Sequence, residues 1–369
     1  MSQPYFNFRL TQGTKVIILK GVKIRSGPKV WPETETYESS GVCIVSKDKI
    51  LALLEEHKGT ILSGNDLSEK LGISRNAIWK SINALRREGH EITSVKNKGY
   101  VLEVGSDHLS ESEIRLYLGA SASSYHILIL DEIPSTNTYV KEHKDLPDHT
   151  VVLAKTQTSG RGRMGKTFHS KDQGGLYLSL LLTKDLTRYN TDLATLAAAL
   201  AAAETLDTKC SVHTLIKWVN DLYLSGRKVC GILTEGSLEF ESGTLNSLII
   251  GVGINVNTES FPEELKDIAT SLYEETGKKF LRSALIADLL INLEKHLLMT
   301  RENPEELLRR YKEKMLYLGE DITIQRGNEI TSGKLLDLSP QGHLIVESQG
   351  KTLTLNSGEI SIRKRVYKK

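Results

Sequence analysis

The spacing of apolar residues between positions 46 and 105 predicts three helices followed by two short strands. Apolar residues recur at helical spacing in KDKILALLEEH, and Leu67 and Leu71 lie four residues apart in the segment that follows. Gly72 ends the second helix, because glycine readily adopts the positive φ found at helix C-termini. Ser74 is a natural N-cap for a third helix, whose apolar residues again line one face.

After Gly89 the spacing changes from helical to alternating. HEITSVKNKGYVLE contains two alternating stretches around a basic tip at residues 96–99, which predicts a hairpin. Two helices joined by a short glycine-containing turn and followed by such a hairpin are typical of a winged helix-turn-helix. Charge supports this interpretation, because seven basic residues and only two acidic ones lie between Lys70 and Lys98.

This winged unit predicts DNA binding. Its third helix and its hairpin tip carry basic side chains that suit phosphates and amide side chains that suit base edges. The candidate contacts are Arg75, Asn76, Lys80, Asn83, Lys96 and Lys98. A solvated basic surface or a protein-interaction module would explain any one of these features, but the turn, the wing and the charge together favour DNA.

Strongly apolar strands alternate with helices between residues 107 and 315. YHILILDEI, GGLYLSLLL, TLIKWVNDLYL and LNSLIIGVGINVN read as strands, and TDLATLAAALAAAETL reads as an alanine-rich helix. Residues 316–369 instead carry short alternating runs such as DITIQ and HLIVE between tight turns, which predicts a small β-barrel.

These patterns define a multidomain chain of the α+β class. We expect a winged helix-turn-helix at residues 46–106, a central α/β domain at 107–315 and the small barrel at 316–369. Residues 1–45 show no convincing periodicity. We expect them to form an N-terminal extension that is either disordered or the product of an upstream start codon.

Composition excludes several classes of protein. Of the 369 residues, 39% are hydrophobic, which is enough for packed cores, and no apolar run is long enough to cross a membrane. The apolar segment Val16–Leu19 is too short for a secretory signal. Cys43, Cys210 and Cys230 fit neither a disulfide framework nor a zinc site. A cytoplasmic protein without a membrane partner is the simplest interpretation.

The clearest chemical signal is TSGRGRMGKTF at residues 158–168. Three glycines within six residues let the backbone approach a ligand and donate its N–H groups, while two arginines and a lysine add positive charge. The spacing excludes a Walker A loop and a dinucleotide-binding loop. The segment therefore indicates a flexible loop that closes over phosphate or carboxylate, although a solvated basic turn has the same composition.

Three further motifs combine polar residues with strands. Lys217 interrupts an apolar strand in KWVND, and it either meets an anionic partner or faces solvent at a sheet edge. Glycines in GVGINVN at 251–257 let a ligand approach, with Asn255 and Asn257 on one face, or else mark a β-bulge. Ser-Thr-Asn at 135–137 either caps a helix or contacts a small polar ligand.

The order of these motifs is more specific than any one of them. STN, then Q-x-x-GRGR, then KWxND, then GxGxNxN, behind a winged helix and before a small barrel, closely resembles the bacterial biotin protein ligases. The resemblance covers residues 46–369 and is strongest to the bifunctional form that also represses biotin synthesis genes. It implies a biotin/lipoate ligase-like catalytic domain and an SH3-like C-terminal barrel.

The resemblance also implies a reaction and its partners. Such enzymes join biotin and ATP to biotinoyl-5′-AMP, with Mg²⁺ accompanying the triphosphate, and then transfer biotin to one lysine of a biotin carboxyl carrier protein such as that of acetyl-CoA carboxylase. The adenylate also acts as corepressor, because it promotes a homodimer that binds a two-fold operator. The sequence does not show the dimer, the operator or the identity of the acceptor.

Site residues follow from the resemblance motif by motif. The expected biotin contacts are Ser135, Thr136, Asn137, Gln157, Arg161, Gly162, Arg163, Lys217, Gly231 and Gly253. The expected ATP contacts are Arg163, Phe168, Lys217, Asn220 and Asn255. Lys217, Arg161 and Arg163 are expected to be catalytic, because they offset the repulsion between the biotin carboxylate and the α-phosphate. The Mg²⁺ ligands are unknown, with Asp221 as the only candidate.

The chain departs from the family pattern at four positions. Met164, Lys166 and Phe168 replace two arginines and a tryptophan of GRGRRGRxW, and Val219 replaces the proline of KWPND. Lys166 keeps a charge without the bidentate geometry of arginine. We expect these changes to affect retention of the adenylate more than the activity itself.

Three other functions remain open at this point. A lipoate or octanoate ligase shares the catalytic fold but is not expected to carry this winged helix together with the GRGR loop. A ligand-sensing transcription factor without catalysis has no need of Lys217 and both loop arginines. A monofunctional ligase with a silent N-terminal module would not bind an operator.

Overall fold

The computed structural model describes most of the chain. The N-terminal extension expected at residues 1–45 lies, up to residue 39, outside the described residues, and residues 42–369 form one compact unit. The described residues are 40–103, 107–171, 173–238, 245–326, 329–356 and 360–364. Among them, no helix combines the length and the apolar composition that crossing a membrane requires.

The predicted winged helix-turn-helix is confirmed. Its elements are α1 (Ser40–Glu56), α2 (Gly64–Leu71), α3 (Arg75–Arg87) and the antiparallel strands β1 (Ile92–Val95) and β2 (Gly99–Leu102). Ser63 and Ser74 cap α2 and α3 with their side chains, and Gly72 ends α2 in the left-handed region at φ 65°. Ile50, Ile78 and Ile82 lie fully buried between the helices.

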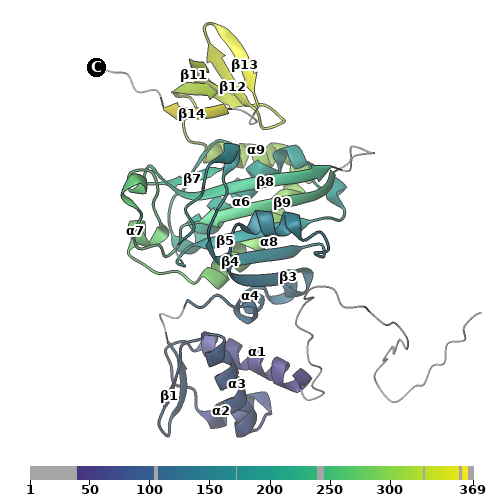
Figure 1. Ribbon diagram of the computed structural model, residues 1–369, viewed down its shortest axis with the longest axis vertical. Helices are drawn as coiled ribbons and strands as arrows, with labels where there is room; N and C mark the ends of the chain where they lie inside the picture. Colours follow the sequence, from purple (N-terminus) through teal and green to yellow (C-terminus); the bar gives the residue numbers. More distant parts are fainter. Residues whose placement is uncertain are drawn as a thin grey trace, which may run out of the picture. The chain divides into compact units, whose positions relative to one another are not determined.

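The central domain is built on a seven-stranded mixed sheet (Figure 1). Its strands lie in the order β3-β4-β5-β9-β8-β7-β6, in which β3 and β4 are parallel and the other neighbours antiparallel. The bounds are β3 His126–Ile133, β4 Thr150–Gln157, β5 Leu176–Leu182, β6 Leu215–Lys217, β7 Asp221–Leu224, β8 Arg227–Leu238 and β9 Leu245–Ile254.

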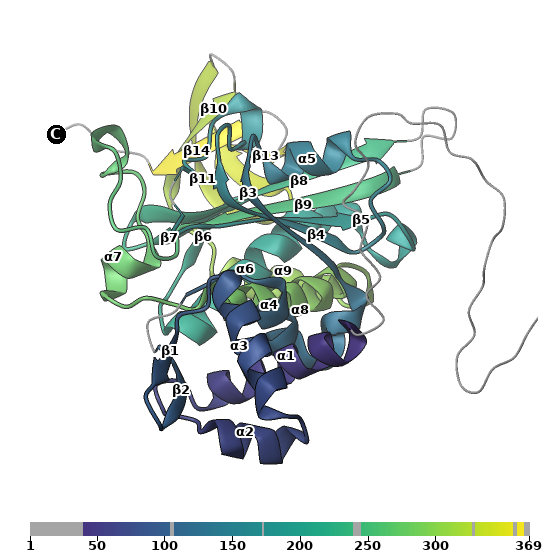
Figure 2. The same ribbon diagram turned by 60° about the horizontal axis from the view of Figure 1, so that its bottom comes forward.

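Helices cover both faces of this sheet. Figure 2 shows α5 (Thr136–Glu142) on one face and α6 (Ala194–Cys210), α8 (Arg282–Glu302) and α9 (Pro304–Glu313) on the other. The alanine run of α6 is completely buried, because small side chains let the helix lie close against its neighbours. Two shorter helices, α4 (Glu111–Leu118) and α7 (Leu272–Thr276), complete the domain.

The KWVND segment differs from the continuous strand that the sequence suggested. It divides into β6 and β7, which form a hairpin around Trp218, Val219 and Asn220. Tertiary contacts stabilise this turn, because Tyr311 donates its hydroxyl to the carbonyl of Val219 at 3.1 Å and the Trp218 indole donates to the carbonyl of Gly342 at 3.0 Å. Trp218 and Val219 are apolar and buried although they lie in the turn, so the sequence reads as a continuous apolar strand there.

The C-terminal residues, whose alternating runs predict a small β-barrel, form an antiparallel sheet. Five strands lie in the order β13-β12-β11-β10-β14, and Ile322, Leu335 and Val346 are among the fully buried residues. The bounds are β10 Asp321–Arg326, β11 Glu329–Leu338, β12 Leu344–Ser348, β13 Lys351–Leu355 and β14 Ile360–Lys364.

Candidate active site

A pocket of about 610 Å³ opens on the face of the central sheet that carries α5, a size suited to small-molecule substrates. All four sequence motifs contribute to its walls. The expected biotin and ATP contacts that line it are Ser135, Thr136, Asn137, Gln157, Arg161, Gly162, Arg163, Phe168, Lys217, Asn220, Gly231, Gly253 and Asn255. The structure thus brings every one of these residues to a single cavity, while their individual roles stay predictions.

The STN segment forms a buried polar end of this pocket. Ser135 is the N-cap of α5, so the capping interpretation and the pocket interpretation both hold. The backbone N–H of Thr136 donates to Oε1 of Gln157 at 2.8 Å, and the Thr136 hydroxyl lies 3.3 Å from the same oxygen. Each of these side chains is at least nine-tenths buried, which makes their hydrogen-bonding groups strong determinants of what binds here.

The glycine-rich loop folds back on itself beside this end. The N–H of Gly162 donates to the carbonyl of Lys166 at 2.7 Å, and Met164 stands in the left-handed region at φ 55°. A β-carbon on Gly160 would lie 2.5 Å from the carbonyl oxygen of Phe168, so only glycine fits there. The loop therefore has the close backbone packing that its glycine content predicted.

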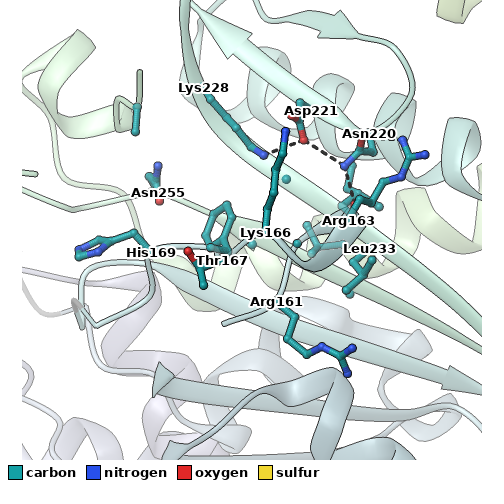
Figure 3. A pocket seen from close by; sticks show the side chains of 18 of the residues that line it. Arg161, Arg163, Lys166, Thr167, His169, Asn220, Asp221, Lys228, Leu233 and Asn255 are labelled. Carbon is teal, nitrogen blue, oxygen red and sulfur yellow. Dashed lines mark hydrogen bonds and ion pairs between the residues drawn. The ribbon is translucent and has the colours of Figure 1, made fainter. Parts of the chain in front are cut away.

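The two loop arginines point in different directions. Arg163 donates to Oδ1 of Asn220 at 3.2 Å, whereas Arg161 is directed away from Asp221 and Lys228 (Figure 3). Burial lowers the pKa of Arg163, and the Asp221 charge opposes this effect. Both arginines are expected to offset charge at one anionic centre, but in this structure only Arg163 lies beside the polar group of Asn220.

Phe168 lies on the two glycines that were expected to make room for a ligand. A β-carbon on Gly253 would approach its ring to 2.8 Å, and one on Gly231 to 3.2 Å. The ring lies 5.7 Å from the ammonium of Lys228, within the range of a cation–π contact. Any substrate that uses the space above these glycines therefore shares it with Phe168 or displaces it.

Lys228 lines the pocket but lies outside all four sequence motifs, so it was not among the predicted site residues. Its ammonium lies 2.7 Å from Oδ1 of Asp221, which also accepts a hydrogen bond from the Asn220 amide at 3.0 Å (Figure 3). Lys217 also lines the pocket, with its ammonium 5.4 Å from the ring of Tyr223. The signal that could have revealed Lys228 is its position three residues before Gly231, at the start of the strand that pairs with Asp221.

The two asparagines after β9 have different surroundings. Asn255 lines the pocket, and its amide donates to the carbonyl of Thr270 at 2.9 Å. Asn257 instead donates to Asp107 at 2.7 Å and to the carbonyl of Phe280 at 2.9 Å. The second asparagine therefore joins three segments of the domain, and the structure does not place it on a ligand-facing side with the first.

The DNA candidates lie where a winged helix presents its contacts. Arg75, Asn76 and Lys80 are exposed on α3, Lys96 and Lys98 are exposed at the wing, and Asn83 is half-buried. Arg86, part of the basic excess, instead donates to the carbonyl of Ile92 and to the hydroxyl of Ser94, both at 2.7 Å. It ties β1 to α3 and therefore positions the wing.

Comparison with known proteins agrees with the order of these domains. The sequence model of the biotin/lipoate A/B protein ligase family matches residues 129–255, that of an HTH domain matches 47–101, and that of the biotin protein ligase C-terminal domain matches 317–363. Bifunctional ligase/repressor BirA of Bacillus spizizenii is 37% identical over 320 residues, which are 85% of this chain and 97% of that protein. The protein of the same name from Escherichia coli is 30% identical over 317 residues, 85% of this chain and 96% of that protein.

Solved structures lead to the same group. A biotin protein ligase from Aquifex aeolicus in complex with biotin and ATP superposes with a TM-score of 0.58 at 34% identity, over 65% of this chain and 99% of that one. Fold and pocket thus define a protein ligase of the biotin/lipoate class that carries a DNA-binding domain. The chain belongs to the family of bifunctional biotin ligase/repressors.

Proposed function

We propose that this pocket binds biotin and ATP side by side, forms biotinoyl-5′-AMP and pyrophosphate, and passes the biotinoyl group to one lysine of a biotin carboxyl carrier protein. The observation that carries the proposal is the convergence of all the expected substrate contacts on one cavity of about 610 Å³. Its two ends also differ in chemistry, because one is buried and neutral and the other is rich in cations.

The neutral end suits the fused ring of biotin. Its ureido group needs both hydrogen-bond donors and acceptors, and Ser135, Thr136, Asn137 and Gln157 supply both kinds from buried positions. With Oε1 of Gln157 held by Thr136, the Gln157 amide nitrogen remains a donor. Buried polar groups of this kind reject ligands that leave them unpaired, which favours biotin over the acyl chains of lipoate or octanoate.

The cationic end suits the reacting groups. A biotin carboxylate must attack an anionic α-phosphate, so positive charge is needed where the two meet. Lys217, Lys228 and Arg163 line the pocket, and we assign them to this end. Arg161 also lines the pocket but is directed away from Lys228, so it would have to turn toward this end when the loop closes (Figure 3). We assign to these residues the neutralisation of charge in the transition state and to Asn220, Asn255 and Phe168 the contacts with the nucleotide.

Magnesium is expected to arrive with the triphosphate. Among the described residues, no cluster of three or more histidine, cysteine or acidic side chains could hold a metal ion, and Asp221 is the only carboxylate that lines the pocket. This donor set fits Mg²⁺, which commonly relies on substrate phosphates, water and one or two carboxylates. Asp221 is the residue that would hold the ion, whose charge would help to neutralise the phosphates.

The glycine-rich loop is expected to protect the adenylate. A mixed anhydride reacts with water, so a loop that closes over it preserves the intermediate until the carrier lysine arrives. Met164, Lys166, Phe168 and Val219 differ from the usual pattern at this loop and at the turn beside it. We expect these differences to shorten retention of the adenylate while adenylation itself continues.

The winged helix adds a regulatory role. We propose that biotinoyl-5′-AMP promotes homodimerisation and that the dimer represses biotin synthesis genes by binding a two-fold operator through α3 and the wing. Dimer and carrier protein would compete for the same adenylate-bound state. Because carrier, ATP and operator meet there, we expect the protein in the cytoplasm. We place domain boundaries near residues 107 and 316, and since α1 begins at Ser40, the winged unit starts before the expected residue 46.

The decisive test is biotin-dependent ATP–pyrophosphate exchange on the purified protein, with lipoate and octanoate as controls. Exchange with biotin alone is the expected result. Exchange with lipoate or octanoate would overturn the substrate assignment, and absence of exchange in folded protein that binds biotin would overturn the enzymatic function. A gel shift with operator DNA, with and without biotin and ATP, tests the repressor.

A further inference from the structure

Glu235 lies on β8 outside the wall of the pocket, yet it connects with the buried polar end. Its Oε2 accepts a hydrogen bond from Nδ2 of Asn137 at 2.9 Å, and its Oε1 accepts one from the ammonium of Lys141. The Asn137 amide also donates to the carbonyl of Leu233 at 3.2 Å. Glu235 thus contacts a pocket residue without lining the pocket itself.

This contact decides how the Asn137 amide is oriented. A carboxylate only accepts hydrogen bonds, and so does the Leu233 carbonyl, so both require the NH₂ group of Asn137 on their side. The amide oxygen must then face Ser179, whose hydroxyl donates to it. Asn137 also packs on Gly251, where a β-carbon would lie 2.2 Å from its oxygen, so no side chain other than hydrogen fits at that position.

The orientation continues along a chain of buried groups. Ser179 is fully buried, and its hydroxyl lies 2.7 Å from the Thr136 hydroxyl. Since the Ser179 hydroxyl has one hydrogen, a Ser179 that donates to Asn137 accepts from the Thr136 hydroxyl. The series ends at Thr136, because its backbone N–H donates to Oε1 of Gln157 whatever the hydroxyl does. Glu235 thus sets the roles of the Asn137 amide and of the Ser179 and Thr136 hydroxyls.

We infer that Glu235 is a positioning residue for the ligase reaction, which sets the donor and acceptor pattern that the buried end of the pocket offers to the biotin ring. The inference rests on the proposed function, because it assigns the ring to this end. Glu235 acts through Asn137, Ser179 and Thr136 and does not touch the substrate itself.

The charge on Glu235 suits this role. Burial raises the pKa of its carboxyl, but hydrogen bonds from Lys141 and Asn137 and the charges of Lys141 and Arg161 outweigh that effect and lower it. The carboxylate therefore remains an acceptor throughout the physiological range. Arg161, whose charge contributes to the lower pKa of Glu235, is directed away from Asp221 and Lys228 (Figure 3).

The test compares Glu235→Ala, Glu235→Gln and Lys141→Met in the pyrophosphate exchange assay. Loss of a hydrogen bond to a charged group predicts that Glu235→Ala raises KM for biotin about tenfold, with KM for ATP and kcat changed by less than about twofold. Glu235→Gln keeps an acceptor oxygen for Asn137 and is expected to restore most of the biotin affinity. Lys141→Met leaves the Asn137 contact in place and is expected to leave KM for biotin unchanged.

A second readout separates positioning from simple stabilisation. In 2-iminobiotin an imine replaces the ring carbonyl, and the resulting guanidinium donates hydrogen bonds where biotin offers an acceptor oxygen. Because Glu235→Ala and Glu235→Gln both remove the carboxylate charge, a difference between these two variants reports the hydrogen-bonding pattern and not the charge. We expect the preference for biotin over 2-iminobiotin to fall in Glu235→Ala and to be kept in Glu235→Gln. Glu294→Ala is the matched control, since Glu294 is also half-buried and ion-paired but lies at a different site on α8.

Three outcomes would overturn the inference. They are an unchanged KM for biotin in Glu235→Ala, a parallel rise of both KM values with a lower melting temperature, and an equal effect of Lys141→Met. The last two would make Glu235 a structural link between α5 and β8. Absence of biotin-dependent exchange in the unmodified protein would instead refute the proposed function, which keeps the two failures distinct.

Discussion

The ammonium of Lys228 lies 2.7 Å from the carboxylate of Asp221, and the two residues lie diagonally on the neighbouring strands β8 and β7. Both side chains are about three-quarters buried. Asp221 therefore partly neutralises a cation at the place where the proposed reaction gathers negative charge. A substrate phosphate or carboxylate that approaches Lys228 competes with Asp221 for it.

We expect Lys228→Met to lower kcat/KM for adenylation by about a hundredfold or more, because removal of one group that stabilises transition-state charge has an effect of this order. The measurement is pyrophosphate exchange at saturating ATP. Lys209→Met is the control, because Lys209 is also ion-paired, to Asp288, but is half-exposed on α6 outside the pocket. Equal activity of the two variants would remove Lys228 from the catalytic group.

Gly253 and Phe168 are expected to be coupled. A methyl group at Gly253 would lie 2.8 Å from the Phe168 ring, so Gly253→Ala must displace the ring. We expect Gly253→Ala to raise KM for ATP about tenfold and the same substitution to have a smaller effect in a Phe168→Ala background, which is the signature of contacting residues. Additive effects in the double variant would show that the added methyl group at position 253 disturbs substrate binding directly and not through Phe168.

The wing lysines are expected to affect DNA binding alone. Lys96 and Lys98 are exposed at the tip between β1 and β2. Replacement of each by alanine should weaken operator binding at every sequence and reduce the slope of log affinity against log salt by about one. Pyrophosphate exchange in the same preparations is the control and should not change. An unaltered salt dependence would exclude phosphate contacts at the wing.

His90 predicts a loss of stability in acid. It is 3% exposed, lies 3.3 Å from the Ser110 hydroxyl and packs edge-on against the His108 ring. Burial first, and then the charges of His108, Lys47 and Lys58, lower its pKa from 6.5 to about 4. Between pH 6.5 and pH 4 this histidine is therefore protonated in the unfolded chain and neutral in the folded chain. The free energy of unfolding falls as pH decreases through this range.

The comparison of thermal unfolding at pH 7 and pH 5 tests this prediction. The melting temperature should decrease from pH 7 to pH 5 in both proteins. We expect this decrease to be a few degrees smaller in His90→Gln than in the unmodified protein. His126→Gln serves as control, because His126 is exposed at the start of β3. The same pH response in all three proteins would assign the acid sensitivity to other groups.

Much of the molecule is determined by local sequence. The helices of the DNA-binding unit follow from the spacing of Leu67, Leu71 and their neighbours and from caps such as Ser74, because helical periodicity and capping act over a few residues. The loop glycines and the strand glycines likewise predict places where the backbone lies close to a neighbouring group. The assignment of the four motifs to one site had a different basis, which was the resemblance of their order to a known family.

Tertiary structure alone decided which of the remaining residues meet. Lys228 reaches Asp221 because of the register of a hairpin, and Glu235 reaches Asn137 from a strand 98 positions away in sequence. Arg86 is one of several similar basic residues in the sequence, and only the fold shows that it donates a hydrogen bond to Ser94 of the wing. Such contacts depend on strand pairing and helix packing over long separations, and a hydrophobic pattern specifies which face of a strand is buried but not which distant side chain lies opposite it.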